Sequence, residues 1–300
     1  MTQFQQAIET AQPVAAVIIS VALMLFSGFL MTRVTKLLRL PSVTAYIVAG
    51  ILIGPYCLDL VPQRIISGTD FLSDIALAFI AFSTGEFFKL SVLKKSGMKV
   101  VWITLFEAVL ASVFVFVLTY FVFRLELAFS IVLAALASAT APASTMMTIR
   151  QTGAKGDFVD TLLQVVALDD VVGLVLYSVA ISVALASLGG SRGFSFETLV
   201  KPVLLNLAAL ALGGLFGLVM KLLMPARRST DNKLIISVAL LFAFCGVCTL
   251  LDVSPLLGCM AMGTVYTNVA ENDKLFKQLG YFSPPILLLF FVRSGMNFKL

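Results

Sequence analysis

Ten stretches of mostly apolar residues follow one another along the chain, and polar residues gather in the short segments between them. A helix that spans a bilayer needs about 20 mainly apolar residues, so each stretch is interpreted as a membrane helix. The stretches are residues 12–33, 41–57, 71–89, 99–123, 127–149, 160–188, 202–221, 234–251, 254–270 and 282–298. The pattern predicts an all-α, polytopic membrane protein in which residues 1–300 form a single transmembrane domain.

The eighth and ninth stretches are almost continuous in sequence. A single helix of that length would measure about 55 Å at 1.5 Å per residue, against a hydrocarbon core of about 30 Å. The segment Asp252-Val-Ser-Pro255 lies between them, and a proline disfavours helix in the residue before it. We therefore predict two helices with a break at Pro255.

Lysine and arginine are distributed unevenly between the two sides of the predicted bundle. The loops after the first, third, fifth, seventh and ninth stretches hold most of them, whereas the loops on the other side hold few. Cytoplasmic loops are enriched in these residues, so the pattern places the protein in the cytoplasmic (inner) membrane with its N-terminus outside. The net charge of +5 is then explained by topology, and nucleic acid is not expected as a partner.

Composition narrows the class further. The chain is 60% hydrophobic and 12% charged, whereas soluble domains average about 25% charged residues, so the expected solvent is the lipid bilayer. The chain contains no histidine, which excludes Ser–His catalysis and histidine zinc ligands. Cys245 and Cys248 lie inside an apolar stretch and are interpreted as small apolar side chains. No cofactor is expected.

Two parts of the sequence resemble each other. When residues 73–90 are aligned with residues 283–300, six of 18 positions are identical, and Gly85 falls on Gly295. The stretch ending at Gly50 resembles the one ending at Gly263 in the same way. Because the paired stretches cross the membrane in opposite directions, this is the pattern of an inverted repeat. The fourth, fifth and sixth helices have no such mates, so the sequence is expected to be truncated after the tenth helix.

The most informative charged residues are Asp169 and Asp170, near the middle of the sixth stretch. An ionisable residue at this depth is costly and is a functional hypothesis by default. Adjacent helical positions diverge by about 100°, so one carboxylate can line a cavity while the other finds a partner. A proton and a small cation that compete for the same carboxylate would be exchanged across the membrane. An ion pair used only for helix packing is the alternative interpretation.

The fifth stretch carries Thr140-Ala-Pro-Ala-Ser-Thr145 at a similar depth. Pro142 removes a helical hydrogen bond, and irregular backbone in a membrane is tolerated only where protein or a cavity covers it. We therefore predict a discontinuous helix near Pro142, with the hydroxyls of Thr140, Ser144 and Thr145 as candidate cation ligands. An ordinary proline kink is the alternative.

Two further charged residues lie within predicted helices, Arg293 in the tenth and Glu107 in the fourth. Either is a candidate ion-pair partner for the other or for an aspartate, and a packing role is as well supported as a transport role. Gly213, Gly214 and Gly217 in the seventh stretch predict close helix packing, with a dimer contact as one candidate use.

These motifs together resemble the bacterial monovalent cation:proton antiporters of the sodium/hydrogen exchanger family. The resemblance rests on Arg39–Pro55, on the Thr140–Thr145 segment and on Ala167-Leu-Asp-Asp-Val-Val-Gly-Leu174. It also includes Ser254–Gly258 and Phe290–Met296, and so spans essentially the whole chain. Arg293 departs from the family pattern, which usually has an uncharged residue there, and it offers Asp169 an alternative partner.

The resemblance implies a homodimer in which a core bundle carries the ion by an elevator-like motion. It also implies that Asp170 is the main cation and proton carrier, that Asp169 pairs with a basic residue on a later helix, and that exchange is electrogenic. The expected substrates are protons and a monovalent cation, with Na⁺ favoured over Li⁺ and K⁺. No enzyme activity is expected.

Three alternatives belong to other classes. An intramembrane aspartyl protease needs two carboxylates that face each other, which adjacent residues on one helix do not supply. A sodium-coupled symporter or channel of similar architecture would show substrate-dependent uptake instead of proton exchange. A sensor would show no flux.

Overall fold

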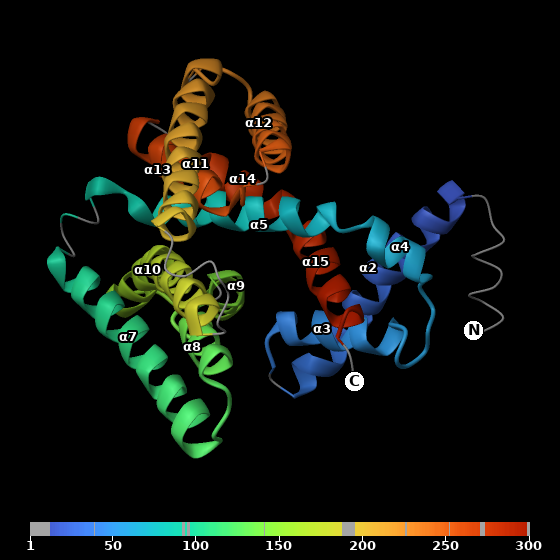
Figure 1. The fold of residues 1–300 in the computed structure, drawn as a ribbon. Helices are drawn as coiled ribbons and strands as arrows, with labels where there is room; N and C mark the ends of the chain where they lie inside the picture. Colours follow the sequence, from blue (N-terminus) through green and yellow to red (C-terminus); the bar gives the residue numbers. More distant parts are fainter. Residues whose placement is uncertain are drawn as a thin grey trace. The chain divides into compact units, whose positions relative to one another are not determined.

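The computed structural model describes residues 13–38, 40–91, 94, 97–140, 142–187, 196–225, 227–251, 253–270 and 274–298. Within these residues the regular elements are helices and no strand is present, which confirms the all-α prediction (Figure 1). The chain divides into two compact units. The first contains Met1–Phe79, Met146–Gly153 and Lys274–Leu300, and the second contains Ile80–Thr145 and Ala154–Asp273.

Each of the ten predicted stretches coincides with a helix or a pair of helices. The elements longer than a short turn are α2 (Pro13–Leu37), α3 (Ser42–Ile53), α5 (Phe71–Thr84) with η1 (Gly85–Phe88), α7 (Met98–Phe116) with η2 (Val117–Val122), α8 (Leu127–Leu136), α9 (Pro142–Thr152), α10 (Asp157–Ser187), α11 (Phe196–Leu223), α12 (Thr230–Leu250), α13 (Leu256–Val269), α14 (Lys274–Phe282) and α15 (Pro284–Met296). Six described helices are long and apolar enough to cross a membrane, and α14 and α15, which are bent by 48° relative to each other, pass the same test when taken as one segment. Three others, α3, α8 and α13, are shorter apolar helices.

Prolines mark where several of these helices begin. Pro284 occupies the first position of α15, where the missing N–H costs nothing because that group would lack an intrahelical partner anyway. Pro13 and Pro142 are the first described residues of α2 and α9. The predicted break between the eighth and ninth stretches is confirmed. Helix α12 ends at Leu250, and α13 begins at Leu256 directly after Pro255.

In the first unit, α2, α3, the short helix α4 (Gln63–Gly68) and α15 surround an apolar core. Its buried members include Met24 from α2, Ile53 from α3, Ile66 from α4 and Val292 from α15. Within this unit α3 crosses α15 at a pair of glycines. A Cβ on Gly50 would lie 1.9 Å from the Val292 carbonyl oxygen, and a Cβ on Gly295 would lie 2.2 Å from that of Ile47.

The second unit contains a crossing of the same kind between the α5–η1 region and α13. A Cβ on Gly263 would lie 2.1 Å from the Phe82 carbonyl oxygen, and a Cβ on Gly85 would lie 2.6 Å from that of Met260. In both crossings each glycine faces the carbonyl three residues before its partner glycine. The sequence repeat pairs Gly50 with Gly263 and Gly85 with Gly295, so the two crossings are the same contact made by the two halves of the repeat.

Two further contacts fix α13 within the second unit. The side chain of Asn268 donates to the Phe88 carbonyl at 3.0 Å and accepts from the Leu90 amide at 2.7 Å, which ties the end of η1 to α13. Helix α11 approaches from another side. A Cβ on Gly213 would lie 1.9 Å from the Gly258 carbonyl oxygen, so the predicted close packing at this glycine is confirmed as a contact inside the chain.

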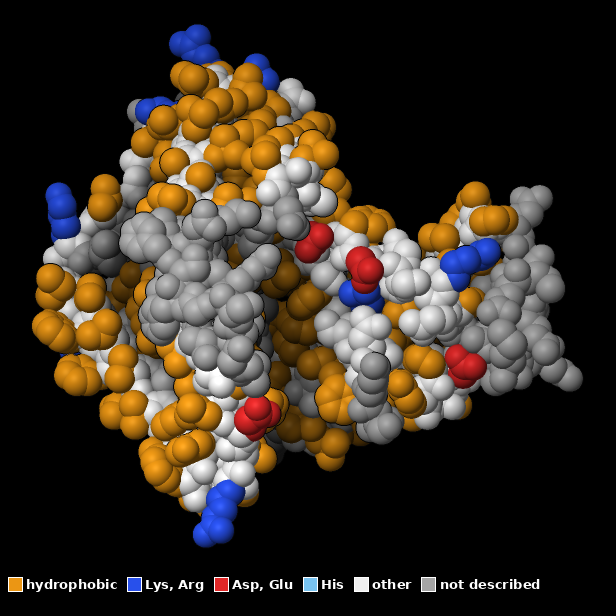
Figure 2. All heavy atoms as spheres, in the orientation of Figure 1, with side chains coloured by type: hydrophobic (Ala, Val, Ile, Leu, Met, Phe, Trp, Pro, Cys, Tyr) orange, Lys and Arg blue, Asp and Glu red, His pale blue; other side chains and the backbone are white. Residues whose placement is uncertain are grey.

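Many large apolar side chains lie on the surface of the described residues. On α7 these include Phe106, Leu110 and Phe114. Figure 2 shows hydrophobic side chains along α7 and around α11 and α12. Such exposure is unfavourable in water and ordinary in lipid, as expected for a multi-pass membrane protein.

Candidate functional site

The candidate site is built around the middle of α10. Asp169 and Asp170 lie about 18 Å from the N-terminal end of this helix at 1.5 Å per residue. Asp169 is completely buried, whereas Asp170 is only partly buried. Consecutive helical residues point about 100° apart, so the two carboxylates have different surroundings, as predicted from their spacing.

The predicted discontinuity is confirmed in the helix that packs against α10. Helix α8 ends at Leu136 and α9 begins at Pro142, and residues 137–140 between them are not helical. The Thr140 hydroxyl from this segment donates a hydrogen bond to Oδ2 of Asp169, and its backbone amide also faces the carboxylate. The break therefore supplies a donor to a buried acid.

A glycine one turn further along α10 makes this contact accessible. A Cβ on Gly173 would lie 2.9 Å from the Cβ of Ala139 and 3.3 Å from the Ser138 hydroxyl oxygen. Gly173 follows Asp169 by four positions, so the two share a face of the helix. Its missing side chain lets α10 approach the break closely enough for Asp169 to reach Thr140.

The two carboxylates differ in how their oxygens are satisfied. Oδ1 of Asp169 is buried and has no hydrogen-bond partner among the described residues. The Asp170 side chain likewise has no hydrogen bond within the part of the chain that the structure describes. Buried acceptors normally have partners, so this site has capacity for a proton or a cation.

The other predicted residues around the site come from α9 and α7. Ser144 and Thr145 occupy the first turn of α9, directly after Pro142, and both are partly buried. Glu107 lies in the middle of α7 and is close enough to Asp169 for the two carboxylates to interact electrostatically. Its Oε2 is buried without a partner among the described residues. Glu107 is therefore a like-charged neighbour of Asp169 and not a counter-charge.

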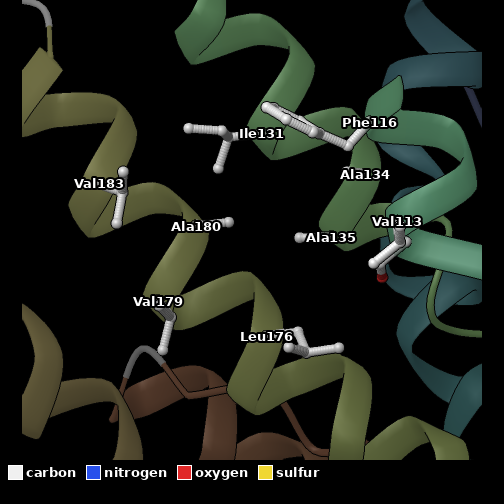
Figure 3. A pocket seen from close by; sticks show the side chains of 10 residues that line it. Val113, Phe116, Ile131, Ala134, Ala135, Leu176, Val179, Ala180 and Val183 are labelled. Carbon is white, nitrogen blue, oxygen red and sulfur yellow. The ribbon is translucent and has the colours of Figure 1, made fainter. Parts of the chain in front are cut away.

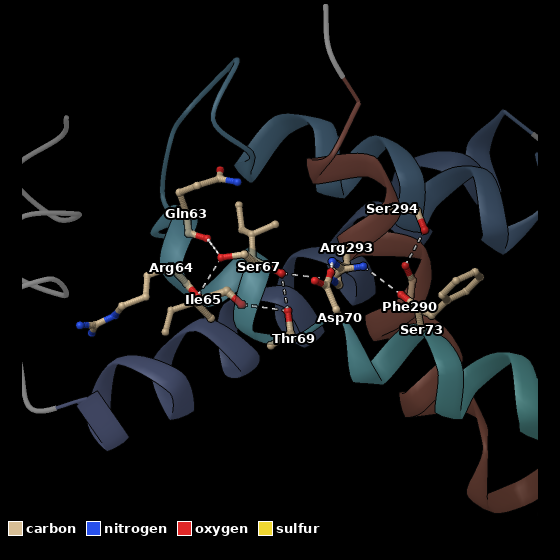
Figure 4. A network of polar contacts seen from close by, with 11 residues as sticks. Gln63, Arg64, Ile65, Ser67, Thr69, Asp70, Ser73, Phe290, Arg293 and Ser294 are labelled. Carbon is tan, nitrogen blue, oxygen red and sulfur yellow. Dashed lines mark hydrogen bonds and ion pairs between the residues drawn. The ribbon is translucent and has the colours of Figure 1, made fainter. Parts of the chain in front are cut away.

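Arg293 has a different partner from those considered in the sequence. Its guanidinium pairs with Asp70 and donates to the Ser73 hydroxyl at 2.9 Å and to the Ile66 carbonyl at 3.1 Å. These residues belong to the first unit, at the junction between α4 and α5 (Figure 4). Arg293 thus belongs to a local network in the first unit. Its described ion-pair partner is Asp70, and not Asp169 or Glu107 as considered from the sequence.

Sequence reasoning missed Asp70 as the ion-pair partner of Arg293. It is 74% exposed and lies at the start of a helix, where an acidic residue is common for capping reasons alone. The available signal was the unexplained positive charge of Arg293 in an apolar helix, which needs an acidic partner somewhere in the fold.

A cavity of about 270 Å³ lies in the second unit between α7, α8 and α10. Its walls are apolar side chains that include Val113, Phe116, Ala135, Leu176 and Ala180, and these converge on it from the three helices (Figure 3). Leu176 follows Asp169 by two helical turns, about 10 Å along the axis. The lining offers few oxygen ligands, so the cavity is not the candidate cation site.

The sequence matches a known family of sodium/hydrogen exchangers, and the fold is similar to that of a solved sodium proton antiporter. Residues 18–300 match the family model described as sodium/hydrogen exchanger, transmembrane. The fold is similar to that of the sodium proton antiporter MjNhaP1 from Methanocaldococcus jannaschii at pH 8, with a TM-score of 0.70, 19% identity, and coverage of 96% of this chain and 74% of that one. An electron-microscopy structure of the same antiporter gives a TM-score of 0.70 at 18% identity, covering 97% and 71%. No curated protein sequence matches the chain significantly.

Proposed function

Because the chain belongs to the sodium/hydrogen exchanger family, whose members are transporters and not enzymes, we propose that it exchanges a monovalent cation for protons by competition at Asp169 and Asp170. Cation:proton antiport across a membrane is the activity of the family. The choice of residues and the mechanism are the proposal.

The observation that carries the proposal is the pairing of a buried mid-helix carboxylate with a broken helix. Asp169 accepts from the Thr140 hydroxyl and retains an unpartnered buried oxygen. Asp170 lies beside it without a described hydrogen bond. Two adjacent carboxylates in a poorly polar environment are unfavourable when both are ionised and unneutralised. Either a proton or a cation relieves this, and binding of one displaces the other.

The donor set is compatible with small hard cations. Carboxylate, hydroxyl and freed backbone carbonyl oxygens are the available ligands near the break, and oxygen ligands suit hard ions. We propose Na⁺ as the favoured substrate, with Li⁺ and K⁺ as the other candidates. Thr140, Ser144 and Thr145 would supply hydroxyl oxygens, and Asp170 would be the principal carrier.

The mechanism that fits the exchange is alternating access. We propose an elevator-like movement that carries the occupied site between the two sides of the cytoplasmic membrane, in a homodimer whose N-termini lie outside. In this scheme the carboxylates move only when a proton or a cation neutralises them, because an empty, charged site is costly to bury.

Everted membrane vesicles test the proposal. A respiration-driven pH gradient is recorded with a fluorescent dye, and Na⁺, Li⁺ and K⁺ are added in turn to vesicles with the wild type or with Asp170→Asn. We expect at least one cation to collapse the gradient in the wild type and none to do so in the variant. Asp160→Asn is the matched control, because Asp160 lies near the start of the same helix, and it should behave as the wild type.

Two results would contradict the proposal. If no cation moves protons between about pH 6 and pH 9, a symporter, channel or sensor becomes the better explanation. If Asp170→Asn exchanges as fast as the wild type, exchange occurs but Asp170 does not carry it.

A further inference from the structure

Glu107 is a half-buried acid in the middle of α7, and the proposed exchange mechanism assigns it no role so far. Its helix, α7, packs against α8 and α10. The buried side of α7 at this level includes Thr104 and Ala108, and Phe106 and Leu110 on other sides are exposed apolar residues. One carboxylate oxygen of Glu107 is buried without a hydrogen-bond partner. An ionised carboxylate in such a position is costly unless something compensates its charge.

Among the described helices, the two that pack most extensively against α7 carry no basic side chain to compensate Glu107. Neither α8 nor α10 includes a lysine or an arginine. On α7 itself the basic residue is Lys99, two turns before Glu107. The charged group with which Glu107 interacts is Asp169, which has the same sign.

We propose that Glu107 is an affinity-determining residue of the cation site, which strengthens cation binding at Asp169 and Asp170 through its negative charge. This inference rests on the proposed function. Among the described residues no group of three acidic, histidine or cysteine side chains is arranged as one metal-ligand set. Glu107 is therefore a positioning residue. Its charge acts on the cation through Asp169, and its carboxylate is not a ligand of the cation.

The physical reason is reciprocity between charges. A cation bound at Asp169 relieves the electrostatic repulsion between the carboxylates of Asp169 and Glu107. It also neutralises part of the negative charge at Glu107. By linkage, the charge of Glu107 favours cation binding by the same factor. A unit charge roughly 6–10 Å away, at an effective dielectric constant of about 20, changes a binding constant by roughly 15- to 100-fold.

The test uses the purified full-length protein in liposomes with Na⁺ as the probe ion. Initial proton efflux is measured against Na⁺ concentration for the wild type, Glu107→Gln, Glu107→Asp and Glu126→Gln. The Gln variant removes the charge and keeps the shape, and the Asp variant keeps the charge. Glu126 is an exposed glutamate in the loop before α8 and serves as the matched control.

We expect the half-saturating Na⁺ concentration to rise at least about tenfold in Glu107→Gln, with the maximal rate reduced less than threefold. Glu107→Asp should stay within about threefold of the wild type, and Glu126→Gln should match it. Na⁺-dependent thermal stabilisation of each purified variant gives the same affinity order even where turnover is lost.

An unchanged half-saturating concentration in Glu107→Gln overturns the inference. Equal losses in the Gln and Asp variants also overturn it, because shape and not charge would then be responsible. If the wild type exchanges none of Na⁺, Li⁺ and K⁺ for protons, the proposed function fails. The Na⁺-stabilisation series then still decides whether Glu107 controls cation binding.

Discussion

Replacing Thr140 by valine removes one hydroxyl and almost nothing else. Valine has the same branched shape, so the packing around the break is preserved. The Thr140 hydroxyl donates to Oδ2 of Asp169, and Oδ1 of that carboxylate is already unpartnered. In Thr140→Val, a completely buried carboxylate is therefore left without a side-chain donor on either oxygen.

The magnitude follows from what the hydroxyl does in the two occupied states. A hydrogen bond to a charged group contributes about 1.5–3 kcal/mol, and the same bond to a neutral acceptor about half as much. The cation-bound site holds an ionised carboxylate, whereas the proton-bound site holds a neutral one. The difference, about 0.8–1.5 kcal/mol, penalises the cation-bound state. With 1.4 kcal/mol for each factor of ten, the half-saturating cation concentration should rise roughly four- to twelvefold at a fixed pH.

Transport in reconstituted liposomes measures this concentration, with Thr140→Ser as the control that keeps the hydroxyl. The serine variant should remain within about threefold of the wild type, because a serine hydroxyl can donate the same bond. Equal half-saturating concentrations for the valine and serine variants would refute the reasoning, since the hydrogen bond to Asp169 would then not distinguish the cation-bound site from the protonated one.

Two further predictions concern the scaffold, and thermal unfolding of the purified protein in detergent measures both. Gly50→Ala and Gly263→Ala should each destabilise by about 1–3 kcal/mol or more, because the added Cβ would meet a carbonyl oxygen at 1.9 or 2.1 Å and the helices must separate. Gly246→Ala, with no described atom within 4 Å, should instead stabilise by about 0.5–1 kcal/mol. Arg293→Ala should cost about 1–3 kcal/mol because it removes all three polar contacts of a guanidinium whose side chain is only 9% exposed, whereas Asp70→Asn should cost at most about 1 kcal/mol because Asp70 is 74% exposed. The reverse order would contradict the network described for Arg293.

The sequence was sufficient for the helices and for the main elements of the site. The length of an apolar run predicts whether a helix can span the bilayer. Prolines such as Pro255 and Pro284 indicate where a helix begins. The equal depth of Asp169 and Thr140 followed from counting residues along two helices. Their hydrogen bond confirms that the predicted break and the predicted acid lie together.

Other features were not accessible from one sequence. Arg293 and Asp70 are 223 positions apart, and no local periodicity links residues so distant. Helix α14 was missed because it is short and carries Lys274 and Lys277, so it did not resemble a spanning segment. Gly173 was part of a recognised motif, but its role as the point of closest approach to the break depends on the packing of two helices.

The internal repeat separates the residues that the helix crossings require from the residues that they do not require. At the two equivalent crossings both halves keep glycine, because each carbonyl contact leaves no space for a Cβ. Two residues before those glycines the halves differ, with Arg293 in one and the buried Ser83 in the other. A charged residue at only one of two equivalent positions is not required by the crossing itself, since the serine half makes the same contact. The crossing therefore does not account for Arg293, whose described contacts are with Asp70, Ser73 and Ile66, and this network distinguishes one half of the repeat from the other.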